Sequence, residues 1–222
     1  MITITAFKWV PPFAQGQVRD HRLRWMLKEV GWPYRVRLID AEVQRSAEYR
    51  ALQPFGQVPI LEEDGRPPMF ETGAILLAIA ERTGMFLPPE PEWHGPVLSW
   101  HFAALNSVEP FLLALAEIEF FLKDEALKEV RRPGARRMVE RRMGEVQAAL
   151  GERDWLVGHD FTLADMTMAS VLKIAASLGL MDGFPTLSAW HERCLARPAY
   201  KAAIAEQMAD FEGHSAADMK WR

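Results

Sequence analysis

The sequence predicts two parts, an α/β domain followed by an all-α helical domain. Short apolar runs rich in β-branched residues alternate with amphipathic helical patterns up to residue 83. Three prolines occupy four positions at residues 88–91, and beyond them strand signals largely vanish. Such a change of periodicity across a stiff linker marks a domain boundary. We therefore expect domains over residues 1–83 and 94–222, joined by a linker over residues 84–93.

The first domain opens with a strand, a helix and a second strand. Apolar and β-branched residues alternate over residues 2–7, which predicts a strand. From Leu23 to Val30 apolar residues recur at the spacing of a helix face, and Gly31 and Pro33 end that helix. Residues 34–39 predict a second strand. Two strands joined by a helix of this length predict a parallel βαβ unit with a right-handed crossover.

The rest of this domain adds a short helix, a hairpin and a buried helix. Residues 46–52 predict the short helix. Strands over residues 58–61 and 68–70 flank the turn Asp64-Gly65, a typical hairpin signal. A helix over residues 72–82 is apolar on most sides and is expected to pack on the sheet. The predicted element order is therefore β-α-β-α-β-β-α.

The second domain reads as helices throughout. A long helical stretch covers residues 97–122, with a kink or break expected at Pro110. A second helix covers residues 124–150, with an interruption near Pro133-Gly134. Leu187, Trp190, His191 and Cys194 mark the last predicted helix, which ends before Pro198.

A further helix, between the second and the last of these, begins at a capping motif. Thr162 and Asp165 have the spacing of a capping box, with Asp in place of the usual Glu. We interpret both residues as structural and not catalytic.

Composition excludes several classes of protein. Residues 1–83 contain 11 Lys and Arg against 10 Asp and Glu, and the remainder 15 against 20, so neither part has the basic excess of a nucleic-acid-binding domain. No apolar stretch is long enough to span a membrane. The six histidines lack the spacing of a metal site, so no metal is expected. A single cysteine and the lack of a signal peptide predict a cytoplasmic protein.

Two motifs lie close together and point to a peptide-binding site. A cis Val58–Pro59 bond would leave the backbone N–H and C=O of Val58 facing outward, where an extended peptide can pair with them. Glu71 can bind an ammonium group, and Thr72, as N-cap, offers a hydroxyl and backbone N–H groups to a carboxylate. A small peptide with an amine and carboxylates fits this arrangement. A trans-proline turn followed by an ordinary threonine cap is the alternative, and it leaves the closeness of the two motifs unexplained.

These residues resemble those of the cytosolic glutathione transferases. That family's Asn-Pro-x-Gly-x-Val-Pro-x-Leu strand and Glu-Ser-x-Ala-Ile helix start read here as residues 53–61 and 71–75. Residues 161–165 resemble its Phe-Ser-x-Ala-Asp motif. The resemblance implies a thioredoxin-like first domain, an all-helical second domain, a homodimer and glutathione as co-substrate. It places glutathione on Val58, Pro59, Glu71 and Thr72.

One further residue beside this motif is a candidate for glutathione binding. Gln57 precedes Val58 and could reach a peptide carboxylate or amide, although an exposed loop glutamine is an equal alternative.

The resemblance departs from the family where the glutathione thiol is activated. Related enzymes supply a Ser, Tyr or Cys between the first strand and the first helix, and residues 8–19 contain none of these. Gln17 lies nearest the expected position and could donate an N–H to a thiolate, and Arg19 could add positive charge. The alternative for each residue, which the sequence alone favours, is a solvated position in the first helical turn.

The leading functional prediction is transfer of the glutathione sulfur to a small apolar electrophile. Glutathione-dependent isomerisation or reduction would use the same thiolate. A non-catalytic glutathione-binding or protein-interaction module is the alternative from another class, and the missing activating residue favours it. The Val58-Pro59 and Glu71-Thr72 motifs favour an enzyme.

Overall fold

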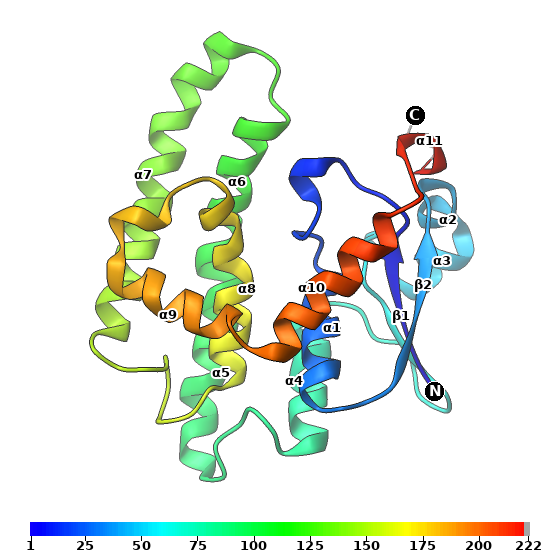
Figure 1. Cartoon of the computed structure of the whole chain (residues 1–222), viewed down its shortest axis with the longest axis horizontal. Coiled ribbons are helices and arrows are strands. Elements are labelled where there is room, and N and C mark those ends of the chain that lie inside the picture. The colour runs from blue at the N-terminus through cyan, green and yellow to red at the C-terminus, as the bar shows by residue number, and fades with distance from the viewer. Residues whose placement is uncertain (220–222) are drawn as a thin grey trace. The chain divides into compact units, whose positions relative to one another are not determined.

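The computed structural model describes residues 1–219 and divides into two units (Figure 1). The first unit comprises Met1–Thr83 together with the chain from Arg197 onward, and the second comprises Gly84–Ala196. The segment from Arg197 onward thus clusters with the sheet, whereas the sequence predicts it as part of the helical domain. The reason is that α10 (Pro198–Phe211) packs along α1 (Asp20–Glu29).

A mixed sheet with strand order β2-β1-β3 forms the centre of the first unit (Figure 1). The strand β1 (Ile2–Phe7) runs parallel to β2 (Tyr34–Ile39) and antiparallel to β3 (Leu61–Glu63). Because α1 connects the two parallel strands, the predicted βαβ unit is confirmed. Together with the helical second unit, this sheet confirms the predicted fold class, a thioredoxin-like domain followed by an all-α domain.

The predicted hairpin is shorter than the sequence suggested. Its first strand begins at Leu61 and not at residue 58. Its second strand is reduced to one bridge, in which Met69 and Leu61 exchange backbone hydrogen bonds of 2.8 and 2.9 Å. Pro59 and Pro68 flank this bridge on the two segments and have no N–H to donate, so the ladder does not extend past them.

The first unit also contains helices that cover the sheet and its edges. Besides α1 and α10, they are α2 (Ala41–Arg45), α3 (Ala47–Leu52), α4 (Thr72–Thr83), α11 (Ala216–Met219) and the short 3₁₀ helix η1 (Pro12–Ala14). The sequence predicted α1, α3 and α4 and missed α2, α10 and α11. The cause of α2 is Asp40, whose carboxylate accepts the backbone N–H groups of Glu42 and Val43 at 3.1 and 3.0 Å.

A buried charge cluster fastens α10 to α1. The Arg24 side chain is fully buried and binds three carboxylates. Its Nε donates to Asp20 at 2.8 Å, one Nη donates to Glu206 at 3.1 Å, and the other binds Asp210. Burial raises the pKa of Asp20, because taking the carboxyl group out of water disfavours its charged form. The Trp25 and Tyr200 rings, with centroids 5.0 Å apart, extend the contact.

The second unit is helical, as predicted. Its elements are η2 (Pro91–Trp93), α5 (His94–Ala103), the π-helical turn η3 (Ala104–Val108), α6 (Glu109–Phe120), α7 (Glu125–Leu150), α8 (Leu163–Ser177), η4 (Met181–Gly183) and α9 (Pro185–Leu195). The predicted irregularity at Pro110 is confirmed, since the helix passes through the π turn immediately before it. The interruption predicted near Pro133 is wrong. Helix α7 continues through this exposed proline because buried apolar residues in its C-terminal half anchor it.

The predicted capping box at the start of α8 is confirmed. The Asp165 carboxylate accepts the backbone N–H of Thr162 at 3.0 Å and its hydroxyl at 2.9 Å. It also accepts the Leu156 N–H at 2.8 Å and the Trp190 Nε1–H at 3.0 Å. Burial raises the pKa of Asp165, and these hydrogen bonds act against that rise. The carboxylate thus joins α8, the loop before it and α9.

Candidate functional site

The hairpin bridge brings the two sequence motifs to the same end of the first unit. In an antiparallel pair, residues before one bridge partner lie beside residues after the other. Val58 is three residues before Leu61, and Glu71 is two residues after Met69. The rings of Phe55 and Phe70, with centroids 6.3 Å apart, show that the two segments stay together beyond the bridge.

Val58 presents unpaired backbone groups in this region. Its side chain is buried in a core cluster, and the Val58–Pro59 bond is cis. Within residues 1–219, no protein group forms a hydrogen bond with the N–H or the C=O of Val58. A backbone with both groups unpaired at the end of a sheet can accept an extended peptide as an added strand.

Glu71 and Thr72 form the N-terminus of α4, in an arrangement that differs from the prediction. The helix begins at Thr72, and the carbonyl of Glu71 accepts the Ile75 N–H at 3.0 Å, so Thr72 is the first helical residue and not the cap. Glu71 has φ of +67°, in the left-handed region that non-glycine residues rarely adopt. Strained backbone of this kind clusters at ligand sites. Its exposed carboxylate has no partner among the described residues.

Arg22 adds a positive charge behind this helix end. Its guanidinium is buried, and one Nη donates to the hydroxyl of Thr72 at 3.4 Å, a long hydrogen bond. The first N–H groups of α4 and its dipole already favour an anion there. The arrangement therefore suits a carboxylate at Thr72 and an ammonium group at Glu71. Sequence reasoning missed Arg22, although an arginine within an apolar helix face was a usable signal.

Gln57 is fixed through its backbone and free through its side chain. Its carbonyl accepts the hydroxyl proton of Tyr49 at 2.7 Å. Its side chain is exposed, and no residue of the described chain binds its amide group. The side chain is thus available to a ligand beside Val58.

Gln17 and Arg19 lie at the start of α1, in an ordered connection. The Gln15 side chain donates to the Val10 carbonyl at 3.1 Å, and the Gln17 N–H donates to the Ala14 carbonyl at 2.9 Å. Arg19 is the N-cap residue of α1, one turn before Arg22. The Gln17 side-chain amide is half-buried and makes no hydrogen bond to any residue between 1 and 219. Gln17 and Arg19 therefore lie just before helix α1, which contains Arg22, the residue that binds Thr72.

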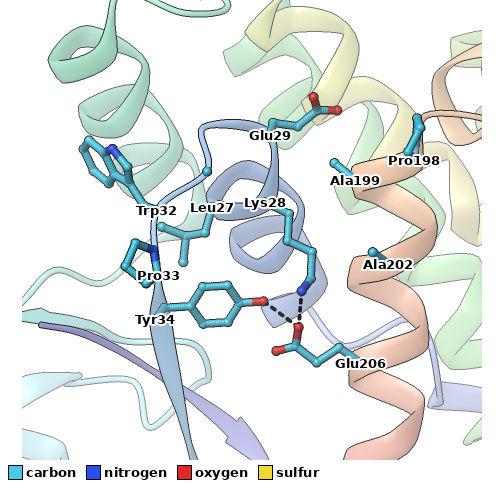
Figure 2. Close-up of a pocket in the computed structure, with 11 residues that line it drawn as sticks. Leu27, Lys28, Glu29, Trp32, Pro33, Tyr34, Pro198, Ala199, Ala202 and Glu206 are labelled. Carbon is cyan, nitrogen blue, oxygen red and sulfur yellow. Dashed lines mark hydrogen bonds and ion pairs between the residues drawn. The ribbon is translucent and has the colours of Figure 1, made fainter.

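A separate pocket in the first unit contains none of the predicted site residues. Residues of α1, β2, the loop between them and α10 line it (Figure 2). Figure 2 shows the Glu206 carboxylate between the Tyr34 hydroxyl, which donates at 2.9 Å, and the Lys28 ammonium group. Since these polar groups bind one another, the pocket leaves few of them for a ligand.

Two kinds of feature are absent from the described residues. In residues 1–219, no group of three or more His, Cys, Asp or Glu side chains could hold a metal ion. Over the same residues, every helix is too short or too polar to cross a membrane.

Comparisons with known proteins point to one family over both units. Residues 20–82 match the family profile described as the glutathione S-transferase N-terminal domain, and residues 108–198 match its C-terminal domain. Glutathione S-transferase F10 of Arabidopsis thaliana is 31% identical over 182 residues, which cover 73% of this chain and 80% of that protein. The disulfide-bond oxidoreductase YfcG of Escherichia coli is 27% identical over 195 residues, with 83% and 89% covered.

A solved structure shares the fold over nearly the whole chain. The glutathione transferase URE2P8 of Phanerochaete chrysosporium, crystallised with oxidised glutathione, superposes with a TM-score of 0.79 at 21% identity. The superposition covers 94% of this chain and 95% of that one. With the family profiles and the Arabidopsis relative, the likeness extends through both units. The chain therefore belongs to the glutathione S-transferase family.

Proposed function

We propose that this protein binds glutathione in its first unit and transfers the glutathione sulfur to a small apolar electrophile. The observation that carries the proposal is the unpaired backbone of Val58 beside the unpaired carboxylate of Glu71. Glutathione has a peptide backbone for Val58 and Pro59, an amine for Glu71, and carboxylates for Thr72 and Gln57. The names of the relatives, and the oxidised glutathione of the fungal structure, support the same ligand.

The chemistry requires a glutathione thiolate, because the thiol itself is a weak nucleophile. The connection before α1 contains no hydroxyl or thiol side chain. In our proposal Gln17 donates an amide N–H to the sulfur, and Arg19 and the N-terminus of α1 supply positive potential. The protein otherwise contributes orientation and a water-poor pocket for the electrophile.

Gln17→Ala is expected to raise the thiol pKa of bound glutathione by about one unit, since a hydrogen bond to a charged group is worth about 1.5–3 kcal/mol. Turnover near neutral pH should fall without being abolished, and glutathione affinity should stay nearly unchanged. Thiolate absorbance titrated against pH measures the shift directly. Gln17→Glu should raise the pKa further, because it places a negative charge near the sulfur. Coinciding curves for wild type and Gln17→Ala would exclude Gln17 as the stabilising group.

A second candidate function is the reduction of disulfides by glutathione. The name of the Escherichia coli relative favours it. In this reaction two glutathione molecules reduce one disulfide to two thiols and become oxidised glutathione. A panel of aryl halides, epoxides and small disulfides separates the functions: conjugation supports the transferase, and thiol release supports the reductase. Glutathione binding without turnover on any of them would favour a non-catalytic binding or interaction module.

The expected location and the expected oligomeric state stay predictions. We expect a cytoplasmic protein and a symmetric homodimer, the commonest closed oligomer. Light scattering at micromolar concentration measures the oligomeric state.

A further inference from the structure

Two buried hydroxyl groups lie behind the segment that carries Val58. Thr5 lies on β1 with no exposed surface, and Tyr49 lies on α3 with 3% of its surface exposed. Their oxygens are 3.1 Å apart. The Ser46 hydroxyl accepts the Tyr49 N–H at 3.1 Å and so caps the short helix that places the tyrosine. The Tyr49 side chain packs in a core cluster with Val58 and Ile60, so the two hydroxyls lie directly beside that segment.

The partners of the two hydroxyls fix the direction of their hydrogen bonds. The Tyr49 hydroxyl has one proton and donates it to the Gln57 carbonyl at 2.7 Å. It therefore accepts the proton of Thr5. The Thr5 oxygen in turn accepts the Ile60 N–H at 2.8 Å. Burial raises the pKa of Tyr49, which keeps its proton in place near neutral pH.

These bonds end on the two residues that flank Val58-Pro59. The regular ladder of β3 begins only at Leu61. Before it, the Thr5 N–H donates to the Ile60 carbonyl at 3.1 Å, and the chain of hydroxyls binds Ile60 and Gln57. The segment is thus held at both ends from within the core, while the backbone of Val58 stays unpaired.

We propose that Thr5 and Tyr49 are positioning residues, which hold the Gln57–Ile60 segment in the conformation that presents the Val58 backbone to glutathione. The inference rests on the proposed function, because that function places the peptide backbone of glutathione against Val58. Because the Thr5 hydroxyl binds Ile60 and Tyr49, it is not available to form a hydrogen bond with the glutathione sulfur. Both residues act through Val58 and do not touch the ligand.

Tyr49→Phe keeps the ring and removes the hydroxyl. The dissociation constant and the KM for glutathione should rise about five- to tenfold, as expected for loss of one or two net hydrogen bonds. The kcat at saturating glutathione should stay within about twofold of wild type, because the sulfur and its donors are unaffected. Thr5→Val should likewise raise the dissociation constant and the KM for glutathione while leaving kcat nearly unchanged. Thr5→Ser, which keeps the hydroxyl, should bind glutathione with wild-type affinity.

Tyr34→Phe is the matched control. The Tyr34 side chain is half-buried in the first unit, and its hydroxyl donates to Glu206 at 2.9 Å and not to the Val58 segment. It should leave glutathione affinity unchanged. Unchanged affinity in Tyr49→Phe, or equal losses in Tyr49→Phe and Tyr34→Phe, would overturn the positioning role.

Amide hydrogen exchange without ligand separates this inference from the proposed function. In Thr5→Val, which removes the acceptor of the Ile60 N–H, the Ile60 amide should exchange at least about tenfold faster than in wild type, while the Leu61 amide, bonded to Met69, should not change. Unchanged Ile60 exchange would overturn the inference even if glutathione binds. A wild-type protein that shows no glutathione binding by calorimetry would overturn the proposed function, and faster Ile60 exchange would still support the role of the hydroxyls in holding the segment.

Discussion

Asp165→Ala is expected to lower the free energy of unfolding by at least about 4 kcal/mol, because it leaves buried donors without an acceptor. One carboxylate binds the N–H groups of Leu156 and Thr162, the Thr162 hydroxyl and the Trp190 indole, all at 2.8–3.0 Å. Alanine removes the acceptor and fills none of its space. Urea denaturation followed by circular dichroism measures the loss, and Trp190 fluorescence reports the local change.

Ser177→Ala is the control for this variant. The Ser177 hydroxyl donates to the Ile174 carbonyl at 2.8 Å at the exposed end of the same helix, so its loss should change stability by less than about 0.5 kcal/mol. Asp165→Asn keeps an acceptor oxygen of the same shape and should give an intermediate loss. Equal denaturation midpoints for Asp165→Ala and Ser177→Ala would contradict a structural role for the capping box.

Arg24→Met should lower the free energy of unfolding by about 3–5 kcal/mol, the usual cost of removing one partner from a buried ion pair. Methionine approximates the shape of the aliphatic stem but leaves Asp20, Glu206 and Asp210 without their shared cation. Thermal and urea denaturation measure the effect, which should fall on the first unit, where α10 packs on α1.

Acid should restore part of this loss. In the folded variant the Asp20 carboxyl, whose pKa burial already raises, also loses the opposing influence of Arg24. A folded-state pKa above the unfolded value means that stability increases as the pH falls through the folded pKa.

Arg136→Ala, the control for Arg24→Met, breaks an exposed pair with Glu140 and should change stability by about 0.5 kcal/mol or less. A loss in Arg24→Met no larger than in Arg136→Ala would show that the cluster does not hold α10.

Local signals predicted most of the fold. The period-2 pattern of residues 2–7, the helix stops at Gly31 and Pro33, and the Thr162-x-x-Asp165 spacing each act within a few residues. The elements that they predict are present. Helix α7 departs from its local signal, because packing of its C-terminal half outweighs the local penalty at Pro133.

Contacts distant in sequence could not be predicted in the same way. Arg24 meets Glu206 and Asp210 across 182 and 186 positions, so nothing in either segment indicated that α10 joins the first unit. The same limit applies to the candidate site. Val58 and Glu71 could be predicted because each lies in a recognisable sequence motif. Thr5 and Tyr49 are 44 positions apart, and only the fold brings their hydroxyls together.

In the proposed complex, glutathione pairs with the backbone of Val58 and with the N-terminus of α4. The most direct measurement is a titration of ¹⁵N-labelled protein with glutathione, followed through its amide resonances. We expect the Val58 and Thr72 amides to shift together to saturation, and the exchange of the Val58 amide to slow as it gains a hydrogen bond. Saturable shifts confined to other residues, such as Lys28 and Tyr34 in the pocket of Figure 2, with Val58 unchanged, would contradict the account.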